Sequence, residues 1–250
     1  MKKFSYPLLV VLLAALVWAP SAGAQQVFPQ IQVGIGTAEE PADVAVTLQI
    51  LFLLTVLSLA PAILVMMTSF TRIVIVLGFV RTAMATNQMP PNQVIIGLAL
   101  FLTAFVMAPT FQSVNEVAIQ PLLANEIEAS EALERGLVPI RNFMFQNTRE
   151  SDLAMFLELS GTPQPHTTDD VPTVVLIPAF IISELKTAFQ LGFVLFIPFL
   201  VIDMIVASTL MSMGMLMLPP VMISLPFKIL LFVMVDGWNL ITRSLLLGYQ

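Results

Sequence analysis

The sequence predicts an all-α integral membrane protein whose hydrophobic helices are kinked or broken and lie in hairpins. Of its 250 residues, 58% are hydrophobic and only 10% are charged, whereas a globular chain is about half apolar and about a quarter charged. Two stretches, 44–71 and 82–115, contain no charged residue, and each exceeds the roughly 20 residues that a spanning helix needs. The 18 prolines recur within the hydrophobic segments, where proline kinks or interrupts a helix. The excess apolar surface must therefore face lipid or partner subunits.

The first segment, residues 1–24, is predicted to be a cleavable signal peptide. Lys2 and Lys3 form a short positive region, and an apolar run follows. Ala22 and Ala24 supply the small side chains that signal peptidase requires before the cleaved bond. We expect cleavage after Ala24, which leaves the new N-terminus on the extracytoplasmic side. An uncleaved N-terminal anchor is the alternative.

Residues 25–43 are expected to form a flexible periplasmic leader, because they are polar and contain glycine and proline. A first hydrophobic helical region follows over 44–111. Pro61 is expected to kink its first helix or split it in two, and a second long helix is expected over 92–109.

Two arginines fix the expected orientation of this region. Arg72 and Arg81 lie beside a short connection between apolar runs. Short loops rich in Lys and Arg stay in the cytoplasm. This orientation agrees with the extracytoplasmic N-terminus that signal cleavage would leave.

The middle segment, 112–170, is predicted to be a water-facing amphipathic helical segment in the periplasm. It holds 10 of the 16 acidic residues and only three arginines, and its apolar residues recur at helical spacing. Gly136 and Pro139 predict the end of one helix and the start of the next. The Ser-Asp pair at 151–152 is a candidate cap for a short helix over 153–159, which Gly161 would stop.

The C-terminal segment, 171–250, is hydrophobic but contains six charged residues and six prolines. Hydropathy predicts two further spans here, near 181–208 and 220–241, which makes about four in the whole chain. A charge at the bilayer centre costs about 2.5–3.5 kcal/mol, so we expect these hairpins to be enclosed by other subunits. The candidate intersubunit or buried charges are Arg72, Glu184, Lys186, Asp203, Lys228 and Asp236.

The sequence offers few parts for catalysis, so we expect no enzyme, metal or cofactor. There is no cysteine, and the only histidine, His166, lies in a predicted loop. No phosphate-binding or metalloprotease motif is present, and no basic patch indicates nucleic acid. One alternative is an intramembrane hydrolase that uses Asp203 and Asp236, although ion pairing with Lys228 is favoured. A small-solute or ion transporter is the other alternative, because transporters also contain broken helices and embedded charges.

The most unusual local feature is a run of methionines around Gly214. Met211, Met213, Met215 and Met217 alternate with other residues, and two prolines follow. The two-residue period favours a loop over a helix face. Because methionine is unbranched and polarizable, such a loop either packs irregular core space or forms a compliant apolar seal. Several copies around a pore would block water and ions by dewetting.

Several ordered motifs resemble the FliP family, the export-gate subunits of flagellar type III secretion. The resemblance covers roughly residues 44–248 and is specific, because many long motifs occur in the same order. They are Met66-Met-Thr-Ser-Phe-Thr-Arg72, Pro90-Pro-Asn-Gln-Val94, Pro178-Ala-Phe-Ile-Ile-Ser-Glu-Leu-Lys-Thr-Ala-Phe-Gln-Leu-Gly192, Pro198-Phe-Leu-Val-Ile-Asp203, Leu225-Pro-Phe-Lys228 and Asp236-Gly-Trp238.

The resemblance implies a subunit of a helical, pore-containing assembly at the flagellar basal body in the bacterial inner membrane. Several copies would join FliQ-like and FliR-like membrane subunits and other components of the export apparatus, surrounded by membrane lipid. Unfolded flagellar export substrates would pass through the pore. The resemblance also implies that the methionine loop is the pore gate and that Glu184 and Lys228 form intersubunit salt bridges. Leu216 departs from the pattern, since relatives can have methionine there; leucine is similarly apolar but stiffer.

Overall fold

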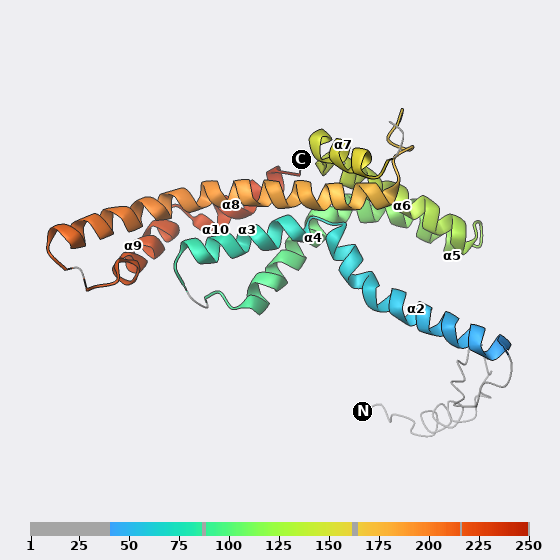
Figure 1. Ribbon diagram of the computed structural model, residues 1–250, viewed down its shortest axis with the longest axis horizontal. Helices are drawn as coiled ribbons and strands as arrows, with labels where there is room; N and C mark the ends of the chain where they lie inside the picture. The colour runs from blue at the N-terminus through green and yellow to red at the C-terminus, as the bar shows by residue number, and fades with distance from the viewer. Residues whose placement is uncertain (1–40, 87–88, 162–164, 216, 250) are drawn as a thin grey trace, which may run out of the picture. The chain divides into compact units, whose positions relative to one another are not determined.

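The computed structural model describes residues 41–86, 89–161, 165–215 and 217–249, and within these ranges every regular element is a helix (Figure 1). The all-α prediction is therefore confirmed. The predicted signal peptide, with Ala24, and nearly all of the predicted leader lie outside the described residues. The helices are α2 Pro41–Met66, α3 Phe70–Ala83, α4 Asn92–Val114, the π-helical turn η1 Asn115–Ile119, α5 Gln120–Leu123, α6 Ala129–Asn147, α7 Glu150–Leu159, α8 Thr173–Ser212, α9 Pro220–Met234 and α10 Gly237–Leu247.

The chain divides into two units, 1–51 and 52–250, and the helix α2 contains the boundary between them. This helix is continuous through Pro61, so the proline does not split it. Its large apolar side chains are exposed, for example Phe52 at 70%. In water such a surface would be unfavourable, so α2 needs another apolar surface to cover it.

The main core of residues 52–250 forms where α3 packs along α8 and against α4 (Figure 1). Ile73, Val76 and Leu77 on α3 are almost completely buried. Gly192 lets the two helices approach closely, because a Cβ atom there would lie 2.5 Å from a ring carbon of Phe79. The absence of a side chain at this position therefore sets the spacing between α3 and α8.

Two helical segments are long and apolar enough to cross a membrane. They are Asn92–Leu123, which comprises α4, η1 and α5, and Thr173–Ser212, which is α8. The pair α9 and α10, bent by 63°, can act as a third span. The first of the four spans that hydropathy predicts corresponds to α2. Its apolar stretch, Leu48–Ile63, is shorter than the two spanning-length helices.

A second core lies where α6 and α7 pack against the first half of α8. Phe143 and Met144 on α6 meet Leu176 and Phe180 on α8 there. All four are buried. The middle segment is thus attached to a spanning-length helix through its apolar face.

The predicted helix break at Gly136 and Pro139 is wrong, because α6 continues through both residues. Gly136 instead marks a close helix contact: a Cβ atom there would lie 3.3 Å from the Cβ atom of Ala118 on η1. The predicted short helix is confirmed as α7, and Gly161, with φ of +64°, follows its end. Only glycine adopts this left-handed conformation without strain.

Candidate functional site: buried charge pairs and a methionine loop

Arg72 on α3 and Glu184 on α8 form a buried bidentate ion pair. The Arg72 Nε donates to the Glu184 Oε2 at 3.0 Å, and the Arg72 Nη2 donates to the Oε1. The exposed fraction of Glu184 is 0% and that of Arg72 is 3%. A charge buried to this extent is stable only when it is paired and hydrogen-bonded, so this pair joins the two helices inside the protein.

The C-terminus completes this cluster. The Tyr249 hydroxyl donates to the Glu184 Oε2 at 2.6 Å, and the Arg72 guanidinium lies 3.9 Å from the centre of the Tyr249 ring. The Arg72 Nη1 also donates to the Gly248 carbonyl at 2.9 Å. The Tyr249 ring also stacks with the Phe143 ring, at 5.9 Å between centroids. One cluster therefore connects α3, α6, α8 and the end of the chain.

A second cluster attaches α7 to α8. Lys186 donates to the Asp152 Oδ1, and the Ser183 hydroxyl donates to the Asp152 Oδ2 at 2.8 Å. Asp152 is 1% exposed, so it is a docking residue rather than the helix cap that its sequence position suggested. The hydrogen bond from Lys186 holds the pKa of the Asp152 carboxyl below its usual value. Lys186 itself is half exposed.

The third pair joins α8 to α9. The Lys228 Nζ donates to the Asp203 Oδ2 at 2.6 Å, and the Ser224 hydroxyl donates to the Oδ1 at 2.5 Å. Lys228 is 2% exposed. Asp236, by contrast, is exposed at the bend between α9 and α10, with φ of +49°. Asp203 is thus engaged by Lys228, and Asp236 takes no part in this pair.

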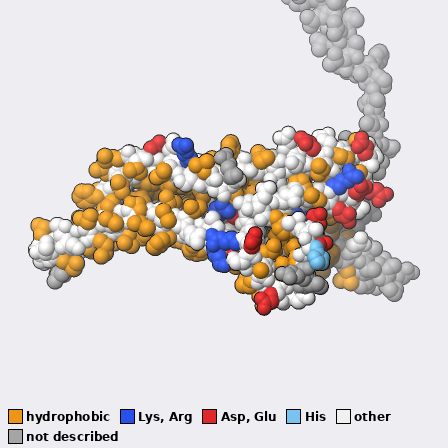
Figure 2. Space-filling model, turned by 90° about the horizontal axis from the view of Figure 1, so that it is seen from above, with side chains coloured by type: hydrophobic (Ala, Val, Ile, Leu, Met, Phe, Trp, Pro, Cys, Tyr) orange, Lys and Arg blue, Asp and Glu red, His pale blue; other side chains and the backbone are white. Residues whose placement is uncertain are grey.

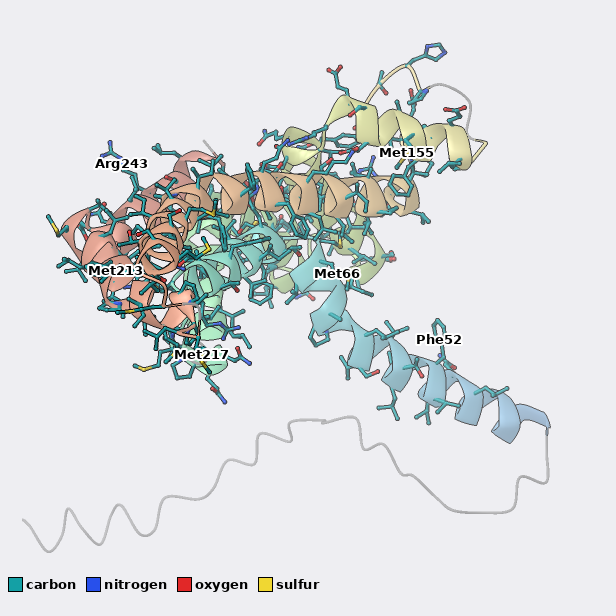
Figure 3. All side chains as sticks on the ribbon, turned by 60° about the vertical axis from the view of Figure 1, so that its left-hand side comes forward. Phe52, Met66, Met155, Met213, Met217 and Arg243 are labelled. Carbon is teal, nitrogen blue, oxygen red and sulfur yellow. The ribbon has the colours of Figure 1, made fainter. Side chains whose placement is uncertain are left out.

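The four methionines lie at the turn between α8 and α9, and all are exposed. Met211 is in the last turn of α8, whereas Met213 caps the helix and the others follow Gly214. The prediction of a single loop is therefore correct only from Met213 onward. Gly214 has φ of +75°, and the Met215 amide donates back to the Leu210 carbonyl at 3.0 Å. Figure 3 shows Met213 and Met217 at the end of this hairpin, and Met217 is 98% exposed.

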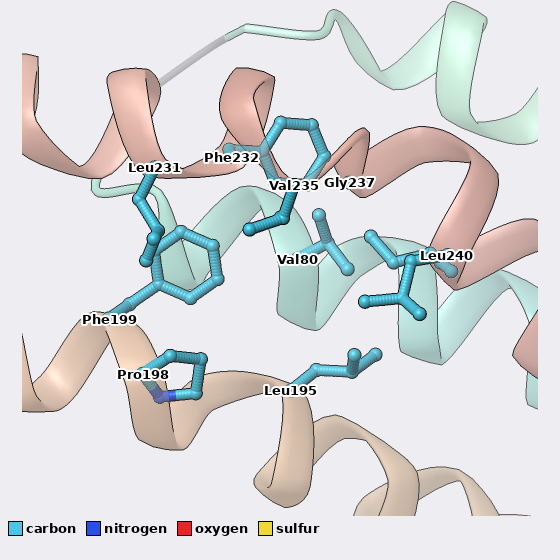
Figure 4. A pocket seen from close by; sticks show the side chains of 10 residues that line it. Val80, Leu195, Pro198, Phe199, Leu231, Phe232, Val235, Gly237 and Leu240 are labelled. Carbon is cyan, nitrogen blue, oxygen red and sulfur yellow. The ribbon is translucent and has the colours of Figure 1, made fainter.

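A pocket of about 200 Å³ lies among α3, α8, α9 and α10 (Figure 4). All of its lining side chains are apolar, including Val80, Phe199 and Phe232. A binding site for a polar solute needs a few converging polar groups, and this pocket has none. Among the described residues, no group of His, Cys, Asp or Glu side chains is placed to hold a metal ion.

Spanning-length apolar helices, charges that are paired between helices and an exposed methionine turn define the class: an all-α membrane protein. Within this class the chain belongs to the FliP family, because the sequence profile of that family matches residues 53–245. The resemblance inferred from the motifs is thereby confirmed.

Curated relatives agree with this assignment. The flagellar biosynthetic protein FliP of Bacillus subtilis is 59% identical over 217 residues, which cover 87% of this chain and 98% of the relative. The protein of the same name from Caulobacter vibrioides is 51% identical over 97% of this chain and 90% of its own length. The Aquifex aeolicus protein is 47% identical, over 89% of this chain and 92% of its own.

Sequence reasoning missed the parts of these clusters that depend on tertiary structure. It selected Arg72, Glu184 and Lys228 as embedded charges but not Tyr249, which follows the last predicted hydrophobic run. It also placed Asp152 in a solvated segment. One signal in the sequence could have identified Tyr249 as a cluster member: it is an aromatic side chain with a polar hydroxyl that directly follows an apolar run, and a buried tyrosine hydroxyl usually has a hydrogen-bond partner.

Proposed function

We propose that this protein is a membrane pore subunit of the flagellar type III secretion export gate. It passes unfolded flagellar proteins across the bacterial inner membrane at the basal body and is needed for flagellum assembly. Several copies act together with FliQ-like and FliR-like subunits and other export components. The family supports the role in flagellum assembly, since its curated relatives are named flagellar biosynthetic proteins.

The observation that carries the proposal is the large apolar surface left uncovered around paired internal charges. Figure 2 shows hydrophobic side chains gathered over the end formed by α8 and α9, while acidic side chains lie mainly toward the other end. On α8 and α9, Val194, Ile205 and Val233 are 61–69% exposed. Contiguous apolar patches of this kind mark membrane or subunit contacts. The charges of α8 and α9 are neutralised inside the chain, so this surface is free to pack against lipid and other subunits.

The methionine loop supplies the gate in this proposal. Its four thioether side chains extend from the tip of the α8–α9 hairpin, and their flexibility suits a seal that yields to a passing chain. Glu184 and Lys228 already have partners within the chain. A contact of either residue with another subunit would therefore have to share or open the existing pair.

The same proposal places the acidic segment, 112–170, in the periplasm and the mature N-terminus after Ala24. Asp152 is buried, so it is unsuitable for labelling from outside. Glu158 on α7 is exposed and provides a better position for a membrane-impermeant label on an introduced cysteine. Labelling of intact cells would support this orientation, and labelling only after lysis would contradict it.

The gate can be tested by replacing Met211, Met213, Met215 and Met217 together with alanine. We expect the resting assembly to conduct small ions, because shorter side chains leave a wider, wettable gap. Conductance of the purified complex in planar bilayers measures this. The matched control is Met155→Ala on α7, where an exposed methionine lies outside the hairpin (Figure 3). Unchanged conductance in the fourfold variant, with the complex intact, would contradict the gate.

A further inference from the structure

Two charged side chains of the C-terminal hydrophobic segment have no charged or hydrogen-bonding partner in the part of the chain that the structure describes. They are Asp236, at the bend between α9 and α10, and Arg243, on α10. The other four charges of this segment all take part in ion pairs within the chain. Asp236 and Arg243 are both exposed, and Figure 3 shows Arg243 pointing away from its helix. They have opposite charges.

Both residues lie at exposed positions along α10: Asp236 is the N-cap residue, with φ of +49°, and Arg243 is within the helix. Leu240, Arg243 and Leu247 follow the spacing i, i+3 and i+7, which places these three on the same face of the helix. All four are exposed, whereas Ile241 and Leu245 on the opposite face are buried. Seven residues of helix separate the acid from the base by about 10 Å along the axis. The two charges therefore do not neutralise each other within one chain.

The surroundings of the two charges are complementary. Arg243 lies at a groove of about 590 Å³ between α4 and α10, whose apolar lining includes Phe105 and Trp238. Asp236 directly follows an exposed apolar corner, in which Val233 and Met234 are 69% and 76% exposed. One surface is thus an apolar projection that ends in an acid. The other is a largely apolar groove that carries a base.

We propose that these surfaces join copies of this chain head to tail, with Asp236 of one copy paired with Arg243 of the next. Each copy has one acid and one base, so the same contact can repeat from copy to copy around an assembly. Apolar surroundings strengthen an ion pair and penalise an unpaired charge, which makes the pairing favourable there. The inference rests on the proposed multi-copy gate and assigns one of its contacts.

Charge reversal tests the pairing. Asp236→Arg and Arg243→Asp are each expected to reduce the yield of the full-size complex in mild detergent at least tenfold, because each places like charges together. The double variant is expected to restore it. Since Asp236 has a positive φ, Asp236→Asn is the gentler variant, and we expect an intermediate loss. Glu158→Arg, at an exposed α7 position, is the control and should leave the complex unchanged.

Three results would overturn the pairing. Failure of the double variant to assemble while both single variants remain folded, as judged by helical circular dichroism, is one. Single variants that assemble as well as the wild type are the second. The third is loss of co-purifying anionic phospholipid from Arg243→Asp with an unchanged copy number, because that result would make the groove a lipid site.

Crosslinking tests whether positions 236 and 243 of neighbouring copies lie close together. Because the chain contains no cysteine, only the introduced cysteines of this chain can react. Asp236→Cys and Arg243→Cys are co-expressed in differently tagged chains with the partner subunits, and a short bismaleimide is added. We expect a product that contains both tags, and a ladder beyond dimers when both cysteines are in one chain. A ladder that stops at dimers would exclude head-to-tail contact.

Different results would exclude the multi-copy gate and the contact between positions 236 and 243. If the wild-type complex contains a single copy of this chain, the proposed multi-copy gate is wrong. If several copies are present and no product joins positions 236 and 243, only the inferred contact is wrong.

Discussion

At the scale of single residues, the structure shows how charges are accommodated inside an apolar helical protein. Glu184 accepts hydrogen bonds from Arg72 and from the Tyr249 hydroxyl. Arg72 in turn donates to the Gly248 carbonyl. Removing one member of a buried ion pair leaves the other charge uncompensated, which is far more costly than removing a neutral hydrogen bond. The members of this cluster are therefore unequal.

This inequality gives the first residue-level prediction. Glu184→Ala should lower the free energy of unfolding by about 3–5 kcal/mol because it strands the Arg72 guanidinium. Tyr249→Phe keeps the ring on Arg72 and removes one hydrogen bond to a charged group, so about 1.5–3 kcal/mol is expected. Denaturant unfolding in mild detergent, followed by circular dichroism, measures both. Equal losses in the two variants would show that the carboxylate is not the centre of the cluster.

At the scale of helices, short polar contacts determine which elements pack together. Asp152 holds α7 on α8 through Ser183 and Lys186, although the two helices also share apolar contacts. Gly136 and Gly192 act in the same way by allowing close helix contacts. From the sequence, Gly136 is predicted to end a helix, but in the structure it lies within α6. The contact partner, Ala118, could not be identified without the tertiary structure.

The docking of α7 is expected to depend on pH. The pKa of Asp152 in the folded protein lies below its usual value, chiefly because of the hydrogen bond from Lys186. The unfolded state therefore binds the proton more readily. The contribution of Asp152 to stability is complete above the ordinary aspartate pKa of about 4 and is lost as the pH falls through the lower, folded value.

Hydrogen exchange of residues 150–159 as a function of pH measures this docking. The protection should persist to a lower pH in the wild type than in Lys186→Met, in which the stabilising hydrogen bond is absent. Lys186 is half exposed, so solvent screening makes the effect modest. Val194→Met, at an exposed position on the same helix, is the control. Identical pH profiles for the wild type and Lys186→Met would contradict the assigned cause.

At the scale of the whole molecule, composition predicted a membrane protein, because the chain has too few polar residues to cover a soluble protein, and the long uncharged runs predicted helices. Hydropathy also located the runs that become α4, α8 and the bent pair α9–α10. The pairing of the embedded charges was beyond the sequence. Arg72 and Glu184 are 112 positions apart, and only the packing of α3 along α8 selects this partner from the available acids.

The candidate site was also only partly predictable from the sequence. The methionine run was visible as a pattern, and the structure places its members at one hairpin tip. The lack of a partner at Asp236 and Arg243, in contrast, depends on how the fold pairs the other charges of the C-terminal segment. An unpaired charge is a property of the folded chain, so no local sequence pattern identifies it.

The central claim is that this chain works as one of several copies, enclosed with other subunits around a passage. Native mass spectrometry of the complex released from membranes in mild detergent tests it most directly. We predict a particle that contains more than one copy of this chain together with other export-apparatus subunits. A fully functional particle that contains a single copy of this chain and no other subunit would contradict the account.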